Sequence, residues 1–480
     1  MKELCDRALD TARTRGASYA DVRIVRREVQ TISAKNGKVE ALAHSDSLGF
    51  GVRVIADGAW GFAASATLSG PEMDRVAAQA VQIARASALV HRKRVDLGAS
   101  YRIVDSYQTP VQKDPFRVPL DQKIALLLHA TQEMLRAKNI VVAQASVECQ
   151  KEEKTFASTE GSFIHQQIIE TGCGIEATAV GENEVQNRSY PNSVGRHQGT
   201  EGWEFVERWD LPGNAQRIGE EAAALLTAKP CPAGVTTVIL DGSQTALQIH
   251  ESCGHAVELD RVLGTEAAFA GTSFLTPEKL TGFRYGSEAV NLTADATLPG
   301  GLGTFGYDDE GVPAQRWPLV EQGIFKGYLM SRETATALGL RSNGAMRADG
   351  WGRIPLIRMT NVSLEPGIWT LDDLIADTDD GIYMETNRSW SIDDRRLNFQ
   401  FGTEIAWEIK KGKKVALLKN ATYTGMTPAF WGSCDAVCNL DHWLIWGTPN
   451  CGKGQPEQVG HTGHGAAPAR FRNIRVGLMQ

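Results

Sequence analysis

The spacing of hydrophobic positions changes along the chain and marks the elements that we expect. The apolar residues between positions 2 and 15 recur every three or four residues, as on one face of a helix: Leu4, Cys5, Ala8, Leu9 and Ala12. From Ala20 the spacing falls to two, which is typical of strands with one buried face. The dipeptides Asn36-Gly37 and Asp57-Gly58 interrupt this alternation and predict tight hairpin turns.

Helices and strands continue to mix through the first half of the chain. Helical spacing of apolar residues predicts helices at about 71–87, 119–137 and 215–227. Alternating segments between 140 and 180 predict further strands. Helices packed on an antiparallel sheet form an α+β fold, which we expect for an N-terminal domain of residues 1–228.

The segment 228–234, AKPCPAG, has two prolines and one glycine and is the best linker candidate. We therefore expect a second domain over residues 235–480. Its alternating, glycine-rich segments, such as 403–425, predict hairpins and a mostly β architecture. One helix interrupts the β pattern, with Ser243 as a good N-cap, and it runs into the sequence QIHESCGHAVELD at 248–260.

Composition and charge narrow the functional classes. The 480 residues are 42% hydrophobic and 22% charged, as in ordinary globular proteins. A formal net charge of −7 disfavours a nucleic-acid-binding protein, which usually carries a basic surface. No segment approaches the roughly 18 consecutive apolar residues that cross a membrane, and the charged N-terminus lacks the apolar core of a secretory signal. We therefore expect a cytoplasmic protein without membrane or nucleic-acid partners.

The two histidines of HESCGH, His250 and His255, lie five positions apart. In the zinc-protease pattern H-E-x-x-H they lie four apart and share one helix face. Positions five apart differ by roughly 140° in a regular α-helix, so both imidazoles could not reach one ion. A single π-bulge adds one residue to a turn and restores a common face. Because Gly254 is a poor helix former, we predict such a bulge between Ser252 and Gly254.

Glu251 directly follows the first histidine and is the natural general base. A catalytic zinc site usually has three protein ligands and one open position for water. The ion lowers the pKa of that water to about 7, and a neighbouring carboxylate can take its proton and pass it to a leaving amine. The pattern H-E-x-x-x-H is short and also arises by chance, so two ordinary polar helix residues are the alternative interpretation.

A third metal ligand has to come from elsewhere in the chain. The eight cysteines are scattered and do not form a disulfide framework, so one of them could be a ligand. Cys253 lies close in sequence to both histidines, which makes a shared ion awkward. We interpret Cys434 and Cys438 as buried thiols and the histidines of 461–464 as part of a solvated tail loop. Cys451 lies between glycine- and proline-rich turns, where a loop can present it to a site.

Several long segments resemble, in the same order, the TldD/PmbA metallopeptidases, on the TldD side of that family. GASYADVRIVRREVQTISAKNGKVE and GFGVRVIADGAWGFAASA resemble the N-terminal domain of the family, and HESCGHAVELD resembles its H-E-x-x-x-H-x-x-E-x-D signature. YDDEGVPAQRWPLVEQGIFKGYLMSRETA, MTNVSLEPG and CGKGQ resemble its later segments. The resemblance runs nearly end to end and is far more specific than the histidine spacing.

The resemblance implies a role for each residue of the motif. His250 and His255 would be imidazole ligands of one divalent metal ion, Cys451 the thiolate ligand and Glu251 the catalytic glutamate. Two histidines and one cysteine suit Zn²⁺, although iron or cobalt fit the same donors. The family hydrolyses unstructured peptides, and its active subunits pair with a metal-free paralogue around an internal cavity. We therefore expect a peptide-cleaving metallopeptidase that is a homodimer or a heterodimer with such a paralogue.

Other residues of the matched segments have two interpretations each. Glu258 and Asp260 would orient a ligand imidazole or form a charge pair at the helix end. Asp308 and Asp309 would bind substrate or, as we favour, make a turn. Three tryptophans would wall the cavity or, as we favour, pack in the core: Trp431, Trp443 and Trp446.

A non-enzymatic function is the alternative to hydrolysis. The chain would then be a metal-stabilised subunit that binds peptides or modulates a partner. The intact His-Glu pair with a three-ligand set argues against this alternative, since structural metal sites are usually closed by four ligands. The sequence therefore favours a catalytic site with an open coordination position.

Overall fold

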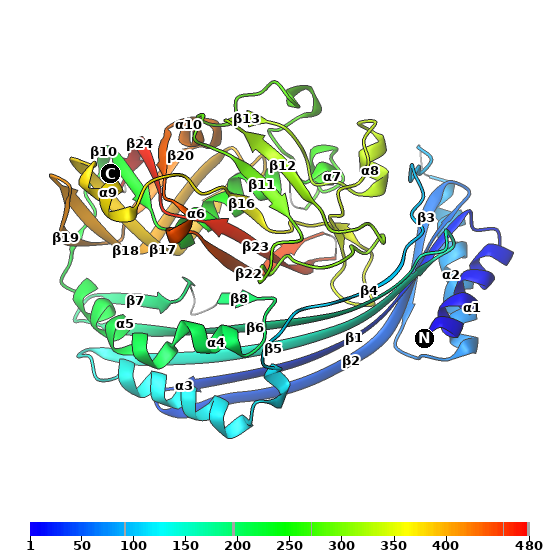
Figure 1. Ribbon diagram of the computed structural model, residues 1–480, viewed down its shortest axis with the longest axis horizontal. Helices are drawn as coiled ribbons and strands as arrows, with labels where there is room; N and C mark the ends of the chain where they lie inside the picture. The colour runs from blue at the N-terminus through cyan, green and yellow to red at the C-terminus, as the bar shows by residue number, and fades with distance from the viewer. Residues whose placement is uncertain (91–92, 194–196, 270, 455, 478–480) are drawn as a thin grey trace.

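The computed structural model describes residues 1–90, 93–193, 197–269, 271–454 and 456–477 (Figure 1). Two eight-stranded sheets dominate the structure, one from each half of the chain, and helices pack on both. The α+β fold expected from the sequence is confirmed. No described helix is long and apolar enough to cross a membrane.

The first sheet has the strand order β3-β2-β1-β5-β6-β4, and β7 and β8 also pair with β6. Neighbouring strands are antiparallel, as predicted, except β4 and β6, which run parallel. The strands are β1 (Tyr19–Lys35), β2 (Lys38–Ala56), β3 (Ala59–Ser65), β4 (Val104–Gln108), β5 (Ile140–Ser158), β6 (Phe163–Val180), β7 (Val185–Tyr190) and β8 (His197–Gly199). The long strands curve beneath the second half of the chain (Figure 1).

Two tight turns join the first three strands. Asn36 and Gly37 have φ angles of 51° and 75°, and Asp57 and Gly58 have φ angles of 53° and 88°. Two consecutive residues with positive φ form the turn whose twist matches that of the flanking strands. Both predicted hairpins are confirmed.

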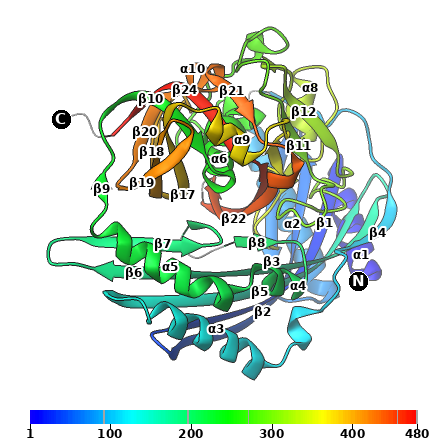
Figure 2. The same ribbon diagram turned by 60° about the vertical axis from the view of Figure 1, so that its left-hand side comes forward.

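Helices cover the first sheet in two groups, each around its own apolar core. One group packs at the end of the sheet where the N-terminus lies, and the other packs along its lower and outer side (Figures 1 and 2). All four helices predicted in this half are present with shifted ends. The helices are α1 (Lys2–Thr14), α2 (Gly70–Ala88), α3 (Leu120–Met134), α4 (Glu204–Trp209) and α5 (Leu211–Leu225).

The second sheet has the order β17-β10-β24-β20-β18-β19-β9, with β21 beside β24. An additional pairing of β17 with β18 closes part of this path into a ring. The strands are β9 (Lys229–Pro230), β10 (Gly234–Leu240), β17 (Asp380–Ile392), β18 (Asn398–Lys410), β19 (Lys413–Lys419), β20 (Thr422–Met426), β21 (Cys434–Val437) and β24 (Ala469–Val476). The hairpin predicted at 403–425 is confirmed by β18 and β19.

Among the described residues of this half, three smaller sheets and five short α-helices accompany the second sheet. The sheets are β13-β12-β11-β16, β14-β15 and β22-β23. Their strands are β11 (Leu292–Asp295), β12 (Arg316–Glu321), β13 (Ile324–Phe325), β14 (Met346–Arg347), β15 (Leu356–Ile357), β16 (Val362–Leu364), β22 (Leu444–Lys453) and β23 (Gln458–Ala466). The helices are α6 (Gly242–Ile249), α7 (Leu259–Val262), α8 (Arg332–Thr336), α9 (Leu371–Ala376) and α10 (Thr427–Gly432).

The predicted linker 228–234 leads directly into the second sheet. Its residues Lys229 and Pro230 form β9, which pairs with β19. The division of the chain at this segment into domains 1–228 and 235–480 stays a prediction.

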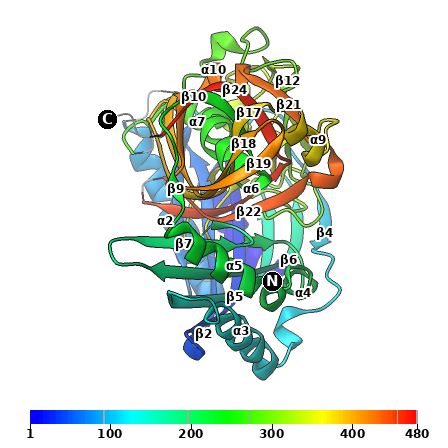
Figure 3. The same cartoon turned by 90° about the vertical axis from the view of Figure 1, so that its left-hand side faces the viewer.

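The β22–β23 hairpin lies between the two large sheets (Figure 3). On one side, the Gly447 N–H donates to Nδ1 of His197 on β8, at 3.1 Å. On the other side, the Gly465 N–H donates to the Ser363 hydroxyl on β16, at 2.9 Å. Elements from both halves of the chain therefore fix the position of the strand that carries Cys451.

The N-cap of α6 is Asp241, so the prediction of Ser243 as the cap is wrong. The Asp241 carboxylate accepts hydrogen bonds from the Ser243 and Gln244 N–H groups. The Ser243 hydroxyl itself donates to Asp241, at 3.1 Å. A carboxylate at the end of β10 satisfies two helix-start N–H groups at once and begins the helix earlier.

Candidate metal centre

The helix α6 continues into one wide turn that carries both histidines of the motif. Residues His250–Gly254 form a π-helical turn, and His255–Val257 follow as a 3-10 turn. The His255 N–H donates to the carbonyl of His250, five residues earlier. The predicted bulge between Ser252 and Gly254 is therefore confirmed.

Side chains from other segments support this turn. Trp431 Nε1 donates to the Ser252 hydroxyl at 2.9 Å, and that hydroxyl donates to the Gln248 carbonyl. The Tyr285 hydroxyl donates to the Ser252 carbonyl at 3.2 Å. These bonds give partners to backbone groups that a regular helix would pair internally, which stabilises the irregular turn.

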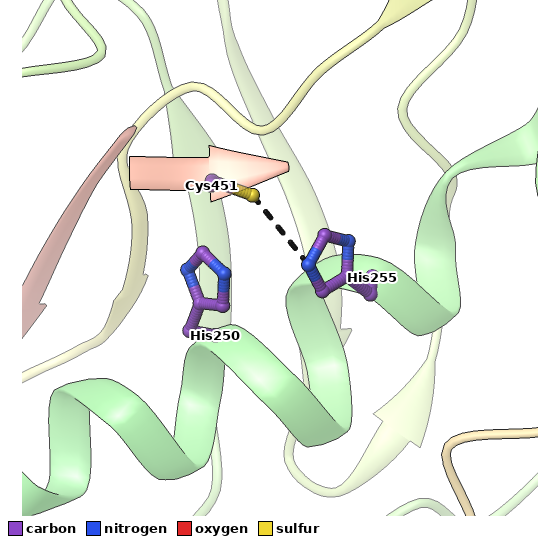
Figure 4. A group of neighbouring side chains, drawn as sticks. All are labelled: His250, His255 and Cys451. Atoms are coloured by element: carbon purple, nitrogen blue, oxygen red, sulfur yellow. Dashed lines mark hydrogen bonds between the residues drawn. The ribbon is translucent and has the colours of Figure 1, made fainter. Parts of the chain in front are cut away.

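The wide turn brings the imidazoles of His250 and His255 to face Cys451 on β22 (Figure 4). One ligand atom of each of these three buried residues lies within 4.8 Å of the other two. His255 Nε2 lies 3.5 Å from Cys451 Sγ. Ligands of a tetrahedral Zn²⁺ lie roughly 3.3–3.8 Å apart, given Zn–N and Zn–S distances near 2.0 and 2.3 Å. The donor set and the His255–Cys451 distance therefore fit such an ion, and a three-ligand site would leave a fourth position for water.

Glu258 determines which nitrogen of His255 faces this cluster. His255 Nδ1 lies 2.9 Å from Glu258 Oε2. Burial raises the pKa of Glu258, but Lys453 and His255 outweigh it and hold that pKa well below its usual range. The ionised carboxylate can only accept, so Nδ1 of His255 carries the proton and Nε2 presents its lone pair. The structure supports the interpretation that Glu258 orients the imidazole of a candidate ligand, His255.

Asp260 has a different environment. Both of its carboxylate oxygens accept hydrogen bonds from Lys453 Nζ, at 2.8 and 2.9 Å. Lys453 lies two residues after Cys451 on β22, so this ion pair ties the motif to the strand that carries the thiol. The structure supports the charge-pair interpretation for Asp260.

His464 on β23 accepts a hydrogen bond from Nδ1 of His250, as Glu258 does from Nδ1 of His255. His464 Nδ1 lies 2.9 Å from the Val362 carbonyl, so Nδ1 is the donor and Nε2 the acceptor. Burial lowers the pKa of His464 well below its ordinary value, which keeps the ring neutral. His250 Nδ1 lies 2.8 Å from His464 Nε2 and therefore carries a proton. The lone pair of His250 Nε2 is left for a metal.

The prediction of a solvated tail loop for 461–464 is wrong. Both histidines are on β23, which pairs with β22 along its length. His464 is fully buried, and His461 Nδ1 lies 2.6 Å from Glu170 Oε2 on β6. Because glycines occur at every second or third position of this segment, its sequence indicated only weakly the strand that packs between two larger layers.

Cys451 differs from the other cysteines of this half in its electrostatic surroundings. Burial raises its pKa, but His255 and Arg358 outweigh that effect and lower it below the usual value, which favours the metal-binding thiolate. Cys253, Cys434 and Cys438 lie in the apolar core, where burial raises each pKa to about 12. The interpretation of Cys434 and Cys438 as buried thiols is confirmed.

Glu251 forms an ion pair with an arginine from another segment. Arg396 Nη1 lies 2.6 Å from Glu251 Oε2. Arg396 is in the loop between β17 and β18 and has a φ of 63°, in the left-handed region. Among the described residues, only Arg396 donates a hydrogen bond to Glu251. Its Oε1 is therefore available to other groups.

A cavity of about 530 Å³ opens over this cluster. His250, His255 and Cys451 line it together with Glu251 and Arg396. Further lining comes from residues 446–452 of β22 and from four residues of β17: Asn387, Trp390, Ser391 and Ile392. A carboxylate, a guanidinium and three potential metal ligands thus share one cavity that is large enough for part of a peptide.

Three family models match successive parts of the chain. Domain 1 of the PmbA/TldA metallopeptidases matches residues 20–84, the central domain matches residues 113–229, and the C-terminal domain matches residues 233–477. The chain belongs to the PmbA/TldA metallopeptidase family. The family predicted from the sequence, and with it the prediction of an enzyme, is confirmed.

Several relatives of similar length are named metalloproteases. A metalloprotease from Methanocaldococcus jannaschii is 34% identical over 93% of this chain and 94% of its own. A metalloprotease from Methanothermobacter thermautotrophicus is 32% identical over 96% of this chain and 95% of its own. A TldD homologue from Saccharolobus solfataricus, named a zinc metalloprotease, is 27% identical over 41% of this chain and 42% of its own.

Solved structures share the fold at low sequence identity. TldE from Thermococcus kodakarensis has a TM-score of 0.77 at 16% identity, over 98% of this chain and 99% of its own. A candidate modulator of DNA gyrase from Thermotoga maritima has a TM-score of 0.76 at 18% identity, over 99% of this chain and 100% of its own. The α+β architecture of this chain is thus shared with both of these solved structures.

The three tryptophans divide between core and cavity. Trp431 is fully buried behind the π-helical turn, and half-buried Trp443 packs against the core, as predicted. Trp446 is also buried in this core, and it lines the cavity as well. The core interpretation is confirmed, and for Trp446 both interpretations hold.

Asp308 and Asp309 have separate roles. The Asp308 carboxylate accepts from the N–H of Glu310 at 2.9 Å, so the predicted turn is confirmed. Asp309 instead lies 2.7 Å from Lys154 on β5 and 3.6 Å from Arg23 on β1. These buried ion pairs join the second half of the chain to the first sheet.

Two side chains that contact the candidate site residues were not assigned these contacts from the sequence. Arg396 follows Arg395 in the turn-like segment DDRRLNF, and nothing in the linear pattern distinguishes the two arginines. Thr462 and His464 occupy alternate positions, as residues on one face of a strand do, so the sequence did contain a signal for the strand that carries His464. That alternation indicates a strand but does not reveal that His250 lies opposite.

Proposed function

We propose that this metallopeptidase hydrolyses peptide bonds with one divalent ion, Zn²⁺, held by His250, His255 and Cys451. The observation that carries the proposal is the convergence of their ligand atoms to within 4.8 Å at one cavity. The hydrogen bonds of Glu258 and His464 to the two Nδ1 atoms support it, because they leave both Nε2 lone pairs for the ion. The ion would polarise the substrate carbonyl and supply a water with a pKa of about 7.

Glu251 is the general base in this proposal. Arg396 holds its Oε2, while Oε1 accepts a proton from the attacking water. The same carboxyl group then passes the proton to the leaving amine nitrogen. The charge-assisted bond to Arg396 orients Glu251 and stabilises its negative charge before the substrate binds.

Unstructured peptides are the proposed substrates. β10 pairs with β17 only from Gly381 to Met384, whereas β17 continues to Ile392 along the cavity. Residues 387–392 of β17 pair with β18, and no other described strand pairs with them. An extended peptide can add to such a free edge by backbone hydrogen bonds, which suits a peptidase with little side-chain selectivity. Trp390, 51% exposed, offers an apolar surface beside this edge.

A peptidase assay on a mixed pool of unstructured peptides, combined with metal analysis, tests the proposal. We expect Glu251→Gln to keep one ion per chain and to lose hydrolysis by about 10²-fold or more. We expect His250→Ala to lose the ion. A fully active Glu251→Gln enzyme would overturn the mechanism. A metal-loaded wild type without any hydrolysis would favour the alternative, a non-enzymatic peptide-binding or modulator subunit.

We also propose that the protein works in the cytoplasm as a pair of subunits, with a second copy or a metal-free paralogue. The free edge of β2 supports pairing, because residues 38–48 are exposed and, within the described chain, pair with β1 alone. Val39, Leu42 and Leu48 give this edge apolar side chains. A long exposed edge presents unpaired backbone N–H and C=O groups that can pair with another chain. Light scattering of the chain alone and with a paralogue measures the pairing, and a monomer in both experiments would refute it.

A further inference from the structure

A second cavity, of about 210 Å³, lies where the first sheet meets the β22–β23 hairpin. Residues of β1, β5 and β6 line one side of it, and Gln458–His461 of β23 line another. The segments 302–309 and 347–349 complete its wall. It is too small for an extended peptide or a cofactor-sized ligand, which need roughly 300 Å³ or more.

Each carboxylate that lines this cavity has a cationic partner. The pairs are Glu170 with His461 at 2.6 Å, Glu152 with Arg27 at 2.9 Å, Asp349 with Arg27 at 2.8 Å and Asp309 with Lys154 at 2.7 Å. The acidic side chains are thus neutralised within the wall itself.

Two further guanidinium groups line the cavity without a carboxylate partner among the described residues. Arg347 Nη2 donates to the Met359 carbonyl. Arg358 donates from Nη1 to the Gln458 carbonyl at 3.2 Å and from Nη2 to the Cys451 carbonyl. The Nε atoms of both arginines are buried and have no acceptor within the described chain.

The two guanidinium groups are close enough to repel each other. Burial, and then the charge of Arg358, lower the pKa of Arg347 to about 10. Arg347 is still charged at neutral pH, and Arg358 is only 2% exposed. Two buried like charges that lack a direct ion pair with a carboxylate repel each other, and an anion between them would offset this repulsion.

We propose that this second cavity binds a small oxyanion, a carboxylate or a phosphate, between Arg347 and Arg358. Guanidinium groups present parallel N–H donors that match the oxygens of such an anion. The cavity size suits a single anionic group. A free phosphate and the C-terminal carboxylate of a peptide are two sources of this chemistry.

The proposed anion site is connected to the metal centre through Arg358. Its guanidinium donates to the Cys451 carbonyl and to the Gln458 carbonyl, so it bridges β22 and β23. Cys451 pairs with Gly460 of β23, which also lines the second cavity. The same hairpin thus forms part of both cavities. The anion site itself does not depend on peptide hydrolysis by the first cavity.

Calorimetric titration of the full chain with inorganic phosphate, in a buffer without other oxyanions, tests the proposal. We expect wild type to bind phosphate and Arg347→Gln to bind it about tenfold or more weakly, the loss of one charge-assisted contact. Arg347→Lys, which keeps a charge, should bind with intermediate affinity. His250→Ala is the matched control for the first cavity and should bind phosphate as wild type does. Thermal unfolding without phosphate shows that each variant is folded.

Two results would overturn the proposal. One is the absence of binding to wild type by phosphate and by acetate. The other is binding that His250→Ala abolishes and Arg347→Gln leaves unchanged, because the anion would then lie at the metal ligands.

A pair of peptides distinguishes the two sources in the Glu251→Gln background, where cleavage is expected to be strongly reduced. One peptide ends in a free carboxylate, and the other has the same sequence with a C-terminal amide. Tighter binding of the free acid that disappears with Arg347→Gln assigns the site to a peptide terminus. Equal binding of both peptides, with phosphate binding sensitive to Arg347→Gln, assigns it to a free oxyanion.

Discussion

His250 Nδ1 lies 2.8 Å from His464 Nε2, and this contact sets the protonation of a proposed metal ligand. His464 donates its own Nδ1 proton to the Val362 carbonyl, so its Nε2 can only accept. A backbone carbonyl on β16 thus determines, through one neutral imidazole, that His250 offers Nε2 to the cavity. Such partners behind a ligand usually tune metal affinity.

Replacing His464 should weaken metal binding. We expect His464→Leu to lower the affinity roughly 10–100-fold, because Nδ1 of His250 loses its acceptor and the imidazole can turn. His464→Gln keeps an acceptor oxygen and should lose less. Competition with a chromogenic chelator measures the affinity. His129→Gln, a change of an exposed histidine on α3, is the control, and equal affinities for all variants would contradict the prediction.

Arg396 should affect the chemical step more than metal binding. We expect Arg396→Gln to lower kcat roughly 10–100-fold, because Glu251 loses its only hydrogen-bond donor among the described residues. Arg396→Lys should restore part of the rate. Steady-state kinetics with metal analysis separates kcat from KM and from metal loss.

The neighbouring Arg395 is the matched control for that experiment. It lies in the same loop with an exposed side chain, so Arg395→Gln should leave kcat within about twofold of wild type. A loss of metal in Arg396→Gln, or an equal loss of rate in both variants, would show that the loop rather than the Glu251 contact is responsible.

The sequence predicted elements where a local signal sufficed. The hairpins at Asn36-Gly37 and Asp57-Gly58 follow from turn chemistry, and the π-type turn followed from the requirement that His250 and His255 face one ion. The long-range contacts of the site were not predictable in this way. His464 meets His250 only because β23 packs between two sheets, and that packing has no signature in the linear order of residues.

The start of α6 illustrates the same limit on a smaller scale. Asp241 and Ser243 are both good caps by residue type. The helix begins after Asp241 because β10 ends there and its carboxylate reaches two N–H groups. A choice between two suitable residues depends on the preceding strand, which a local pattern does not fix.

Removal of the metal should destabilise the wild type. An ion that binds only the folded state stabilises it by RT ln(1 + [L]/Kd), about 4 kcal/mol at a thousandfold excess over Kd. We expect a chelator to lower the thermal unfolding midpoint of wild type and to leave that of His250→Ala unchanged. An identical shift in both proteins would mean that the chelator acts elsewhere.

Gly254 should be intolerant of a side chain. A Cβ at this position would lie 2.0 Å from Met359 Sδ and 3.1 Å from its Cγ. We expect Gly254→Ala to reduce the free energy of unfolding by about 1–3 kcal/mol, as overpacking does in a tight core. Urea unfolding of the metal-free protein measures this without a contribution from the ligands.

Gly432→Ala is the control for this substitution. Gly432 lies in the last turn of α10, and a Cβ there meets nothing within 4 Å. Its replacement should be neutral or slightly stabilising. The combination of Gly254→Ala with Met359→Ala should cost less than the sum of the single changes, because they act on the same contact. Strict additivity would place the cause outside the Met359 contact.

His197 should make the folded protein sensitive to acid. Burial lowers its pKa to about 3, and its Nδ1 accepts a hydrogen bond from the Gly447 N–H at 3.1 Å. In the unfolded chain a histidine has a pKa of about 6.5. The folded pKa lies below the unfolded one, so the stability from the neutral ring is complete above about pH 6.5. It is lost as the pH falls toward 3, because only the unfolded chain takes up the proton.

His197→Asn removes this titration and keeps an acceptor for the Gly447 N–H. We expect the free energy of unfolding of wild type to fall more steeply than that of the variant between pH 7 and pH 4.5, by a few kcal/mol at most. Urea unfolding with a chelator present, at matched pH values, gives the difference directly, because all other titrating groups are common to both proteins. If the free energies of unfolding of both proteins changed in parallel with pH, His197 would be protonated in the folded state as easily as in the unfolded chain.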